Sequence, residues 1–154
     1  MTDSPTRIMA LDIGSKRTGV ALSDETRLFA SPLLTLEETQ IKPWLVKVQK
    51  LVEEHEVAEV LVGLPLNQFG EEGKDALNIR RYIAALQEGL KIPVIEWDER
   101  FTTVQAERTL IDADLSRKNR KKVIDQIAAC IMLQGYLDSL KFNQNLETSS
   151  WDDD

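Results

Sequence analysis

The stretch LDIGSKRTGVALSD, residues 11–24, places a carboxylate inside what otherwise reads as a buried strand. Asp12 interrupts the apolar run 8–13, and the polar residues 14–19 separate that run from a second apolar run, residues 20–22. This pattern predicts two strands joined by a short connection. A carboxylate in an apolar setting is strongly disfavoured unless a cation or a set of hydrogen bonds compensates its charge. Asp12 is therefore the first candidate for a functional residue.

The composition is that of an ordinary globular protein. The chain has 154 residues, of which 42% are hydrophobic and 29% charged, values that predict a single domain with its own core. No apolar run approaches the roughly 20 residues of a membrane span, and the first residues lack a secretory signal, so we expect a cytoplasmic protein without a membrane partner. Cys130 lies among apolar residues and is expected in the core. His55 is the one histidine and follows two acids at the polar end of a helix, which argues against a histidine-based catalytic triad.

Alternating β-rich and helical patterns predict one α/β domain. Three β-rich runs come first, separated by turn residues, which favours antiparallel pairing, and the later strands alternate with helices, which requires parallel crossovers. The predicted strands are 7–13, 19–23, 29–36, 57–62 and 92–97, and the predicted helices are 41–55, 79–90, one beginning near Thr102 or Thr103, and 121–140. The expected fold is a mixed five-stranded sheet flanked by helices within residues 1–142, followed by an acidic, disordered tail, residues 143–154.

Two further acids stand at apolar or strand-terminal positions. Glu99 follows the fifth predicted strand, and Asp125 lies on the last predicted helix beside Ala128 and Ala129, whose small side chains allow close approach to a sheet. Ligands of α/β sheets collect beyond the carboxyl ends of strands, where Asp12 and Glu99 are both expected. Three carboxylates without a histidine or thiol favour a hard cation, Mg²⁺ or Mn²⁺. A pair of such ions can hydrolyse a phosphodiester without a nucleophilic side chain.

Each of the three acids also has a purely structural explanation. A carboxylate can cap a turn or pair with a nearby cation, and the spacing alone gives the structural and the functional explanations equal weight. The candidate structural partners are the Gly14–Ser15 turn for Asp12, Arg100 or Arg108 for Glu99, and Lys121 for Asp125.

Four segments of the sequence resemble the YqgF/RuvX family, whose fold is similar to that of ribonuclease H and of Holliday junction resolvases. The segments are LDIGSKRTGVALSD, VLVGLPLNQFGEEG, DERFTTVQA and RKKVIDQIAACIMLQGYLD, which follow the family's order and span most of residues 8–138. The resemblance implies a ribonuclease H-like fold and a catalytic, metal-binding set made of Asp12, Glu99 and Asp125. Asp98 beside Glu99 leaves the middle carboxylate open, because adjacent residues of a strand face opposite sides of the sheet.

The resemblance also implies an activity, that of a metal-dependent nuclease that matures the 5′ end of pre-16S rRNA, with RNA as the partner. The alternative is a Holliday junction resolvase, which would act on branched DNA and need two sites, as in a homodimer. An ATP-binding phosphotransferase of the actin and sugar-kinase type is a more distant alternative, because Asp-x-Gly followed by basic residues also resembles a phosphate loop. The last alternative is a nucleic-acid-binding module that keeps the fold but has no catalytic activity.

Basic residues supply the expected contacts with nucleic acid, although the net charge of the chain is −7. Residues 143–154 carry −4 of that charge, whereas residues 117–122 place five positive charges in six positions. Such a run is equally typical of a solvated loop, and Asn67 could instead hold the backbone of its own loop. The candidate contacts to phosphate or sugar are Lys16, Arg17, Asn67, Arg100, Arg117, Lys118, Arg120, Lys121 and Lys122.

Overall fold

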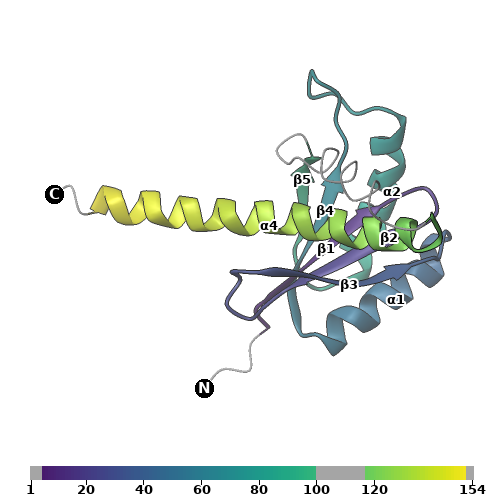
Figure 1. The fold of residues 1–154 in the computed structure, drawn as a ribbon, viewed down its shortest axis with the longest axis horizontal. Helices are drawn as coiled ribbons and strands as arrows, with labels where there is room; N and C mark the ends of the chain where they lie inside the picture. Colours follow the sequence, from purple (N-terminus) through teal and green to yellow (C-terminus); the bar gives the residue numbers. More distant parts are fainter. Residues whose placement is uncertain (1–4, 100–116, 152–154) are drawn as a thin grey trace.

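Five strands form one mixed sheet (Figure 1). The computed structural model of the protein describes residues 5–99 and 117–151, and for 117–122 and 144–151 it describes the backbone alone. The strand order is β3-β2-β1-β4-β5, with β1, β2 and β3 antiparallel and with β4 parallel to both β1 and β5. The strands are β1 (Arg7–Ile13), β2 (Thr18–Ser23), β3 (Ala30–Leu36), β4 (Val57–Leu64) and β5 (Val94–Asp98). The predicted mixed five-stranded sheet is therefore confirmed.

Helices cover both faces of the sheet, and each face has its own apolar core. On one face, α1 (Ile41–Glu54) and α2 (Lys74–Gly89) bury Trp44, Val48, Ile83 and Leu86 against the sheet. On the other face, α4 (Arg117–Trp151) buries Ala129, Met132, Leu133 and Leu137. Figure 1 shows α4 crossing the sheet and continuing beyond it toward the C-terminus.

The alternation of side chains along β1 determines which face receives Asp12. Met9, Leu11 and Ile13 belong to the core under α1 and α2, whereas Ile8 and Ala10 belong to the core under α4. Successive side chains of a strand point to opposite faces. Asp12 therefore lies on the α4 face, at the end of the strand where the apolar layer gives way to the cleft described below.

The observed elements begin and end within a few residues of their predicted positions, with two exceptions. Helix α4 begins at Arg117 and runs to Trp151, through residues 143–151, where the sequence predicts a disordered tail. Residues 136–151 contain neither glycine nor proline, the two residues that most often end a helix, so nothing in them stops the helix. The predicted helix near Thr102 or Thr103 lies outside the described residues.

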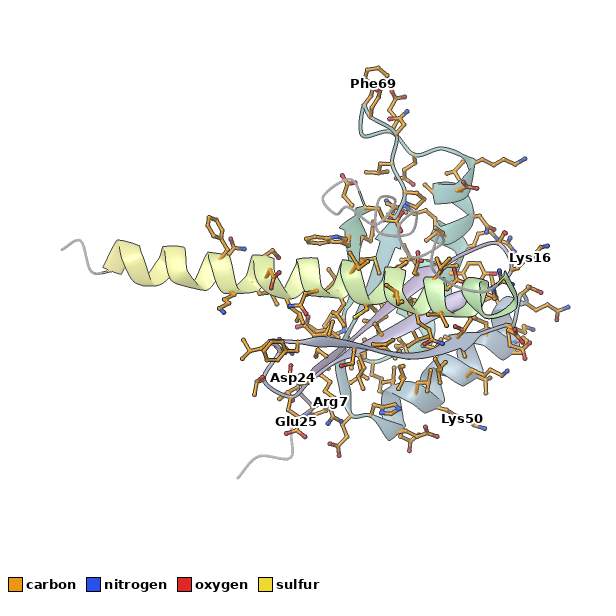
Figure 2. The ribbon with its side chains drawn as sticks, viewed as in Figure 1. Arg7, Lys16, Asp24, Glu25, Lys50 and Phe69 are labelled. Carbon is orange, nitrogen blue, oxygen red and sulfur yellow. The ribbon has the colours of Figure 1, made fainter. Side chains whose placement is uncertain are left out.

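One loop projects from the body of the protein. The chain between β4 and α2 extends away from the sheet and carries Phe69 at its tip, with 74% of that residue exposed (Figure 2). None of the helices within residues 5–99 and 117–151 is long and apolar enough to cross a membrane.

Candidate functional site

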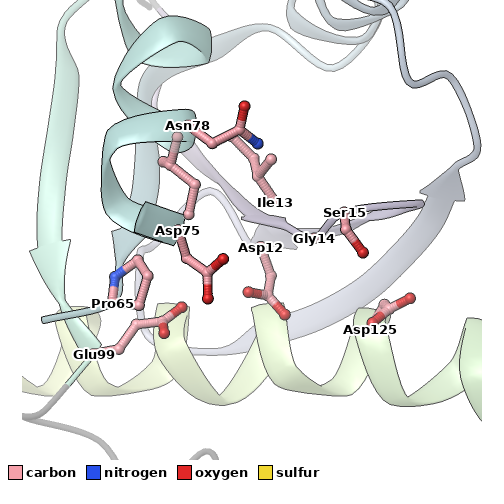
Figure 3. A pocket seen from close by; sticks show the side chains of 10 residues that line it. Asp12, Ile13, Gly14, Ser15, Pro65, Asp75, Asn78, Glu99 and Asp125 are labelled. Carbon is pink, nitrogen blue, oxygen red and sulfur yellow. The ribbon is translucent and has the colours of Figure 1, made fainter. Parts of the chain in front are cut away.

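A cleft of about 310 Å³ lies at the carboxyl ends of the parallel strands (Figure 3). The end of β1, the residue that follows β4 and the residue that follows β5 contribute to the cleft, as do the first turns of α2 and the N-terminal third of α4. The lining residues are Asp12, Ile13, Gly14, Ser15, Pro65, Asp75, Asn78, Ile79, Glu99 and Asp125. Its position is the one that α/β folds generally use for binding ligands.

The three sequence-predicted acids all line this one cleft, although they come from different elements. Asp12 is supplied by β1 and is 7% exposed. Glu99 directly follows β5, and Asp125 comes from α4. Figure 3 shows the carboxylates of Asp12 and Glu99 directed into a common space, with Asp125 on the far side of Asp12.

Glu99, rather than Asp98, lines the cleft. Ile95 and Trp97 pack into the core under α4, and the strand alternation places Glu99 on that same side. Gly63 of the neighbouring strand β4 leaves the necessary room, because a Cβ atom there would lie 2.6 Å from Glu99 Oε1. The pleat of the sheet therefore distinguishes between the two adjacent acids.

Asp125 reaches the cleft because α4 packs directly on the backbone of β2. Gly19 is paired with Asp12 in the antiparallel register of β1 and β2. A Cβ atom at Gly19 would lie 1.9 Å from the backbone oxygen of Asp125, a separation that no side chain tolerates. The absence of a side chain at residue 19 is thus what allows this turn of α4 to lie over the end of β1.

The Asp125 carboxylate forms an ion pair with Arg17. Arg17 Nε donates a hydrogen bond of 3.1 Å to Asp125 Oδ2, and the two side chains are 25% and 22% exposed. The sequence predicts a metal as the partner of Asp125 and a phosphate as the partner of Arg17, and the structure pairs these two side chains with each other. The pairing of Asp125 with Lys121 lies outside the described side chains.

Asp75 and Asn78 are two cleft residues that the sequence analysis missed. Both belong to the first turns of α2, and Figure 3 shows the Asp75 carboxylate directed toward those of Asp12 and Glu99. An acid in the first turn of a helix is common because it interacts favourably with the helix dipole, so its residue type alone carried no functional signal. The available signal was position, since a helix that follows a parallel strand begins at the ligand-binding edge of the sheet.

The structure places the residues predicted to contact nucleic acid in different settings. Lys16 is exposed in the turn between β1 and β2 (Figure 2). Asn67 holds its own loop, because its Oδ1 accepts hydrogen bonds of 2.9 Å from the backbone N–H groups of Phe69 and Glu71. The remaining predicted contacts lie outside the described residues or side chains; they are Arg100, Arg117, Lys118, Arg120, Lys121 and Lys122.

The donor set of the cleft suits a hard divalent cation. The side chains that could coordinate an ion there offer carboxylate, amide and hydroxyl oxygens, and none of the lining residues is a histidine or a cysteine. Oxygen ligands of this kind are those that Mg²⁺ and Mn²⁺ prefer. Among the described side chains, no three acidic, histidine or cysteine side chains are gathered closely enough to hold an ion as they stand.

Comparison with solved structures defines the class of fold. Thermus thermophilus RuvC in complex with a Holliday junction superposes with a TM-score of 0.53 at 12% sequence identity, covering 87% of this chain and 96% of that one. The fowlpox virus Holliday junction resolvase superposes with a TM-score of 0.51 at 15% identity, covering 86% of this chain and 99% of that one. The protein therefore has the ribonuclease H-like fold of the RuvC-like resolvases.

Comparison of sequences gives the family. The chain belongs to the RuvX family, because the sequence model of that family, described as a Holliday junction resolvase, matches residues 6–139. A relative from Thermoanaerobacter pseudethanolicus is 45% identical over 136 residues, which are 88% of this chain and 98% of the relative. One from Syntrophomonas wolfei is 48% identical over 132 residues, 86% of this chain and 94% of the relative. Both are named "Putative pre-16S rRNA nuclease", and the resemblance stated from the sequence is confirmed.

Proposed function

We propose that the protein is a divalent-metal-dependent endonuclease that processes the 5′ end of pre-16S rRNA in the cytoplasm. Membership of a nuclease family supports hydrolysis of phosphodiester bonds, and the names of the relatives support a ribosomal RNA precursor as the substrate. The observation that carries the proposal is the shared cleft, in which Asp12, Glu99 and Asp125 arrive from three separate elements. A merely structural role for each acid would not require them to line one cavity.

The carboxylates would hold Mg²⁺ or Mn²⁺, which when bound supplies water activation and stabilises the leaving oxygen. Asp12 sits on the central strand of the sheet, so its position is well determined by the core on both faces. Glu99 and Asp125 approach it from β5 and α4. Asp75 adds a further negative charge at the N-terminus of α2. The carboxylates of the cleft repel the phosphates of a nucleic acid. Basic side chains around the cleft are therefore needed to bind the substrate backbone.

The first experiment distinguishes RNA from branched DNA. A single preparation is given an RNA fragment that spans the 5′ end of mature 16S rRNA or a four-way DNA junction, each with Mn²⁺ and with EDTA. We expect cleavage of the RNA fragment that EDTA abolishes. Cleavage of the junction alone would favour a resolvase, the alternative supported by the description of the family. A lack of EDTA-sensitive cleavage of both substrates would contradict the nuclease proposal.

The second experiment tests the carboxylates. Asp12→Asn and Asp125→Asn each remove a charge of the proposed metal site with almost no change of shape. Loss of groups that merely orient metal ligands costs 10–100-fold, so loss of a ligand should lower the cleavage rate by about 100-fold or more. Glu88→Gln is the matched control, because Glu88 is exposed near the end of α2 opposite to Asp75. Cooperative urea unfolding checks the folding of each variant, and near-normal cleavage by both Asp variants would refute the assignment.

A further inference from the structure

The ion pair between Arg17 and Asp125 joins two residues for which the proposed function needs different partners. Asp125 is proposed to hold a metal ion, and Arg17 is a candidate contact for a substrate phosphate. In the structure Arg17 Nε lies 3.1 Å from Asp125 Oδ2. The two side chains are separated by 108 residues in the sequence and are each about three-quarters buried. The pair is therefore a specific tertiary contact rather than a chance meeting of exposed charges.

A divalent ion that binds Asp125 through Oδ2 has to replace the Arg17 guanidinium, because Arg17 Nε already donates a hydrogen bond to that oxygen. An ion bound to Asp125 would lie within a few ångströms of the guanidinium, and two cations at such a separation repel each other strongly in a partly buried setting. The backbone of Arg17 is held in place, because Gly14 N–H donates a hydrogen bond of 2.8 Å to the Arg17 carbonyl oxygen. The long Arg17 side chain is thus the part that is able to move.

We infer that Arg17 is a positioning residue that holds the Asp125 carboxylate in the metal-free protein and leaves it when a divalent ion binds. This inference rests on the proposed metal-dependent function. Arg17 belongs to the same β1–β2 turn as Ser15, which lines the cleft, and Lys16, which is exposed. From this turn the released guanidinium is available to a substrate phosphate. Metal binding and RNA binding are then positively coupled, and by thermodynamic linkage each strengthens the other by the same factor.

The inference is tested first by metal affinity. Mn²⁺ is titrated calorimetrically into the wild-type protein, Arg17→Gln, Asp125→Asn and Lys74→Gln. The Arg17 variant no longer has a competitor for Asp125, so it should bind Mn²⁺ about two- to fivefold more tightly, the range expected for a partly exposed ion pair. Lys74→Gln is the control, because it also removes one positive charge next to a cleft residue, Asp75, but removes no described ion pair. The Mn²⁺ affinity of this variant should stay closer to that of the wild type.

A second readout observes the side chain itself. The Nε–H resonance of Arg17 in protein labelled with ¹⁵N-arginine should shift when Mg²⁺ is added to the wild type. In Asp125→Asn, where the carboxylate is already lost, Mg²⁺ should leave this resonance nearly unchanged. The binding of a short single-stranded RNA, measured with Ca²⁺ under conditions where the RNA stays intact, should gain more from the ion in the wild type than in Arg17→Gln.

These results separate the inference from the proposed function. If Asp125→Asn weakens Mn²⁺ binding while Arg17→Gln leaves it unchanged, the metal site stands and the role of Arg17 is overturned. An Arg17 resonance that does not respond to saturating Mg²⁺ in the wild type overturns it as well. If Mn²⁺ binds equally well to the wild type and Asp125→Asn, both the metal role of Asp125 and the inference fail.

Discussion

Gly19 is essential to the position of Asp125, because α4 packs directly against the bare backbone at residue 19. Gly19 lies opposite Asp12 in the register of β1 and β2, and its Cα faces the backbone of Asp125. On the other side of β1, a Cβ atom at Gly63 would lie 2.5 Å from Met132 Sδ and 2.6 Å from Glu99 Oε1, so this glycine leaves room for side chains rather than for backbone. Two glycines thus provide the space in which two of the three acids approach Asp12.

The first prediction concerns Gly19→Ala. The added methyl group would collide with the Asp125 carbonyl, so α4 must shift, and overpacking of this kind costs about 1–3 kcal/mol of unfolding free energy. We also expect weaker Mn²⁺ binding, because the shift moves Asp125 away from Asp12. Urea unfolding and Mn²⁺ titration measure the two effects.

Gly73→Ala is the control for this substitution, because no atom lies within 4 Å of the position that its Cβ would take. It should change the stability by less than about 1 kcal/mol. A Gly19→Ala protein with the stability and Mn²⁺ affinity of the Gly73 variant would show that close packing of α4 is not required.

At the scale of single elements, the β2–β3 hairpin is organised by Asp24. Its Oδ1 accepts hydrogen bonds of 2.9 Å from the N–H groups of both Leu28 and Phe29, and its Oδ2 accepts bonds from the hydroxyl and the N–H of Thr26. The Thr26 hydroxyl and then the Phe29 amide lower the pKa of Asp24 to about 2. The ionised carboxylate is thus part of the turn that sets the register of the hairpin.

The second prediction follows from this pKa. The pKa of Asp24 is about 2 in the folded protein and 3.8 ordinarily, so between pH 2 and 3.8 the unfolded chain binds more protons than the folded one. The contribution of Asp24 to stability is therefore lost as the pH falls from about 4 to 2. Asp24→Ala should be less stable than the wild type at pH 7, and the difference should shrink across this window. Urea unfolding between pH 2 and 7 measures it; a difference that stays constant down to pH 2 would contradict the assignment.

The elements also show what the sequence could and could not predict. A continuous apolar run predicted β1 and made Asp12 stand out as an acid inside a buried strand. Period-two alternation explains why Glu99 rather than Asp98 lines the cleft, a point that required the packing side of β5 to be known. Asp75 was missed because the predicted helix began at residue 79, five residues after the observed start of α2, and because an acid near a helix start is ordinary. The pairing of Arg17 with Asp125 could not be predicted, because it depends on how α4 is laid across β2.

For the molecule as a whole, charge is distributed unevenly around the cleft. The chain carries a net charge of −7, and four acids line the cleft, so binding of a polyanion depends on local basic residues. The sequence predicts that residues 117–122, at the start of α4, provide many of them. Helix α4 also supplies Asp125, so the same element would present phosphate contacts and a metal ligand.

The third prediction tests this arrangement through the dependence of RNA binding on salt. If Lys121 and Lys122 each contact a phosphate, the double variant Lys121→Gln/Lys122→Gln should flatten the slope of log K against log salt by about 1.4, or about 0.7 for each contact with a single strand. Fluorescence anisotropy with a labelled single-stranded RNA measures the slope. Lys50→Gln is the control, since Lys50 is exposed on α1, on the opposite face of the sheet from α4 (Figure 2). Equal slopes for the double variant and the wild type would make the basic run a solvated surface.

The central claim is that Asp12, Glu99 and Asp125 together hold divalent ions, and anomalous diffraction from a crystal soaked in Mn²⁺ tests it most directly. We predict anomalous manganese peaks in the cleft that together contact Asp12, Glu99 and Asp125, with Arg17 displaced from Asp125. The claim would be contradicted by a fully soaked crystal in which the cleft holds no manganese and Arg17 still pairs with Asp125.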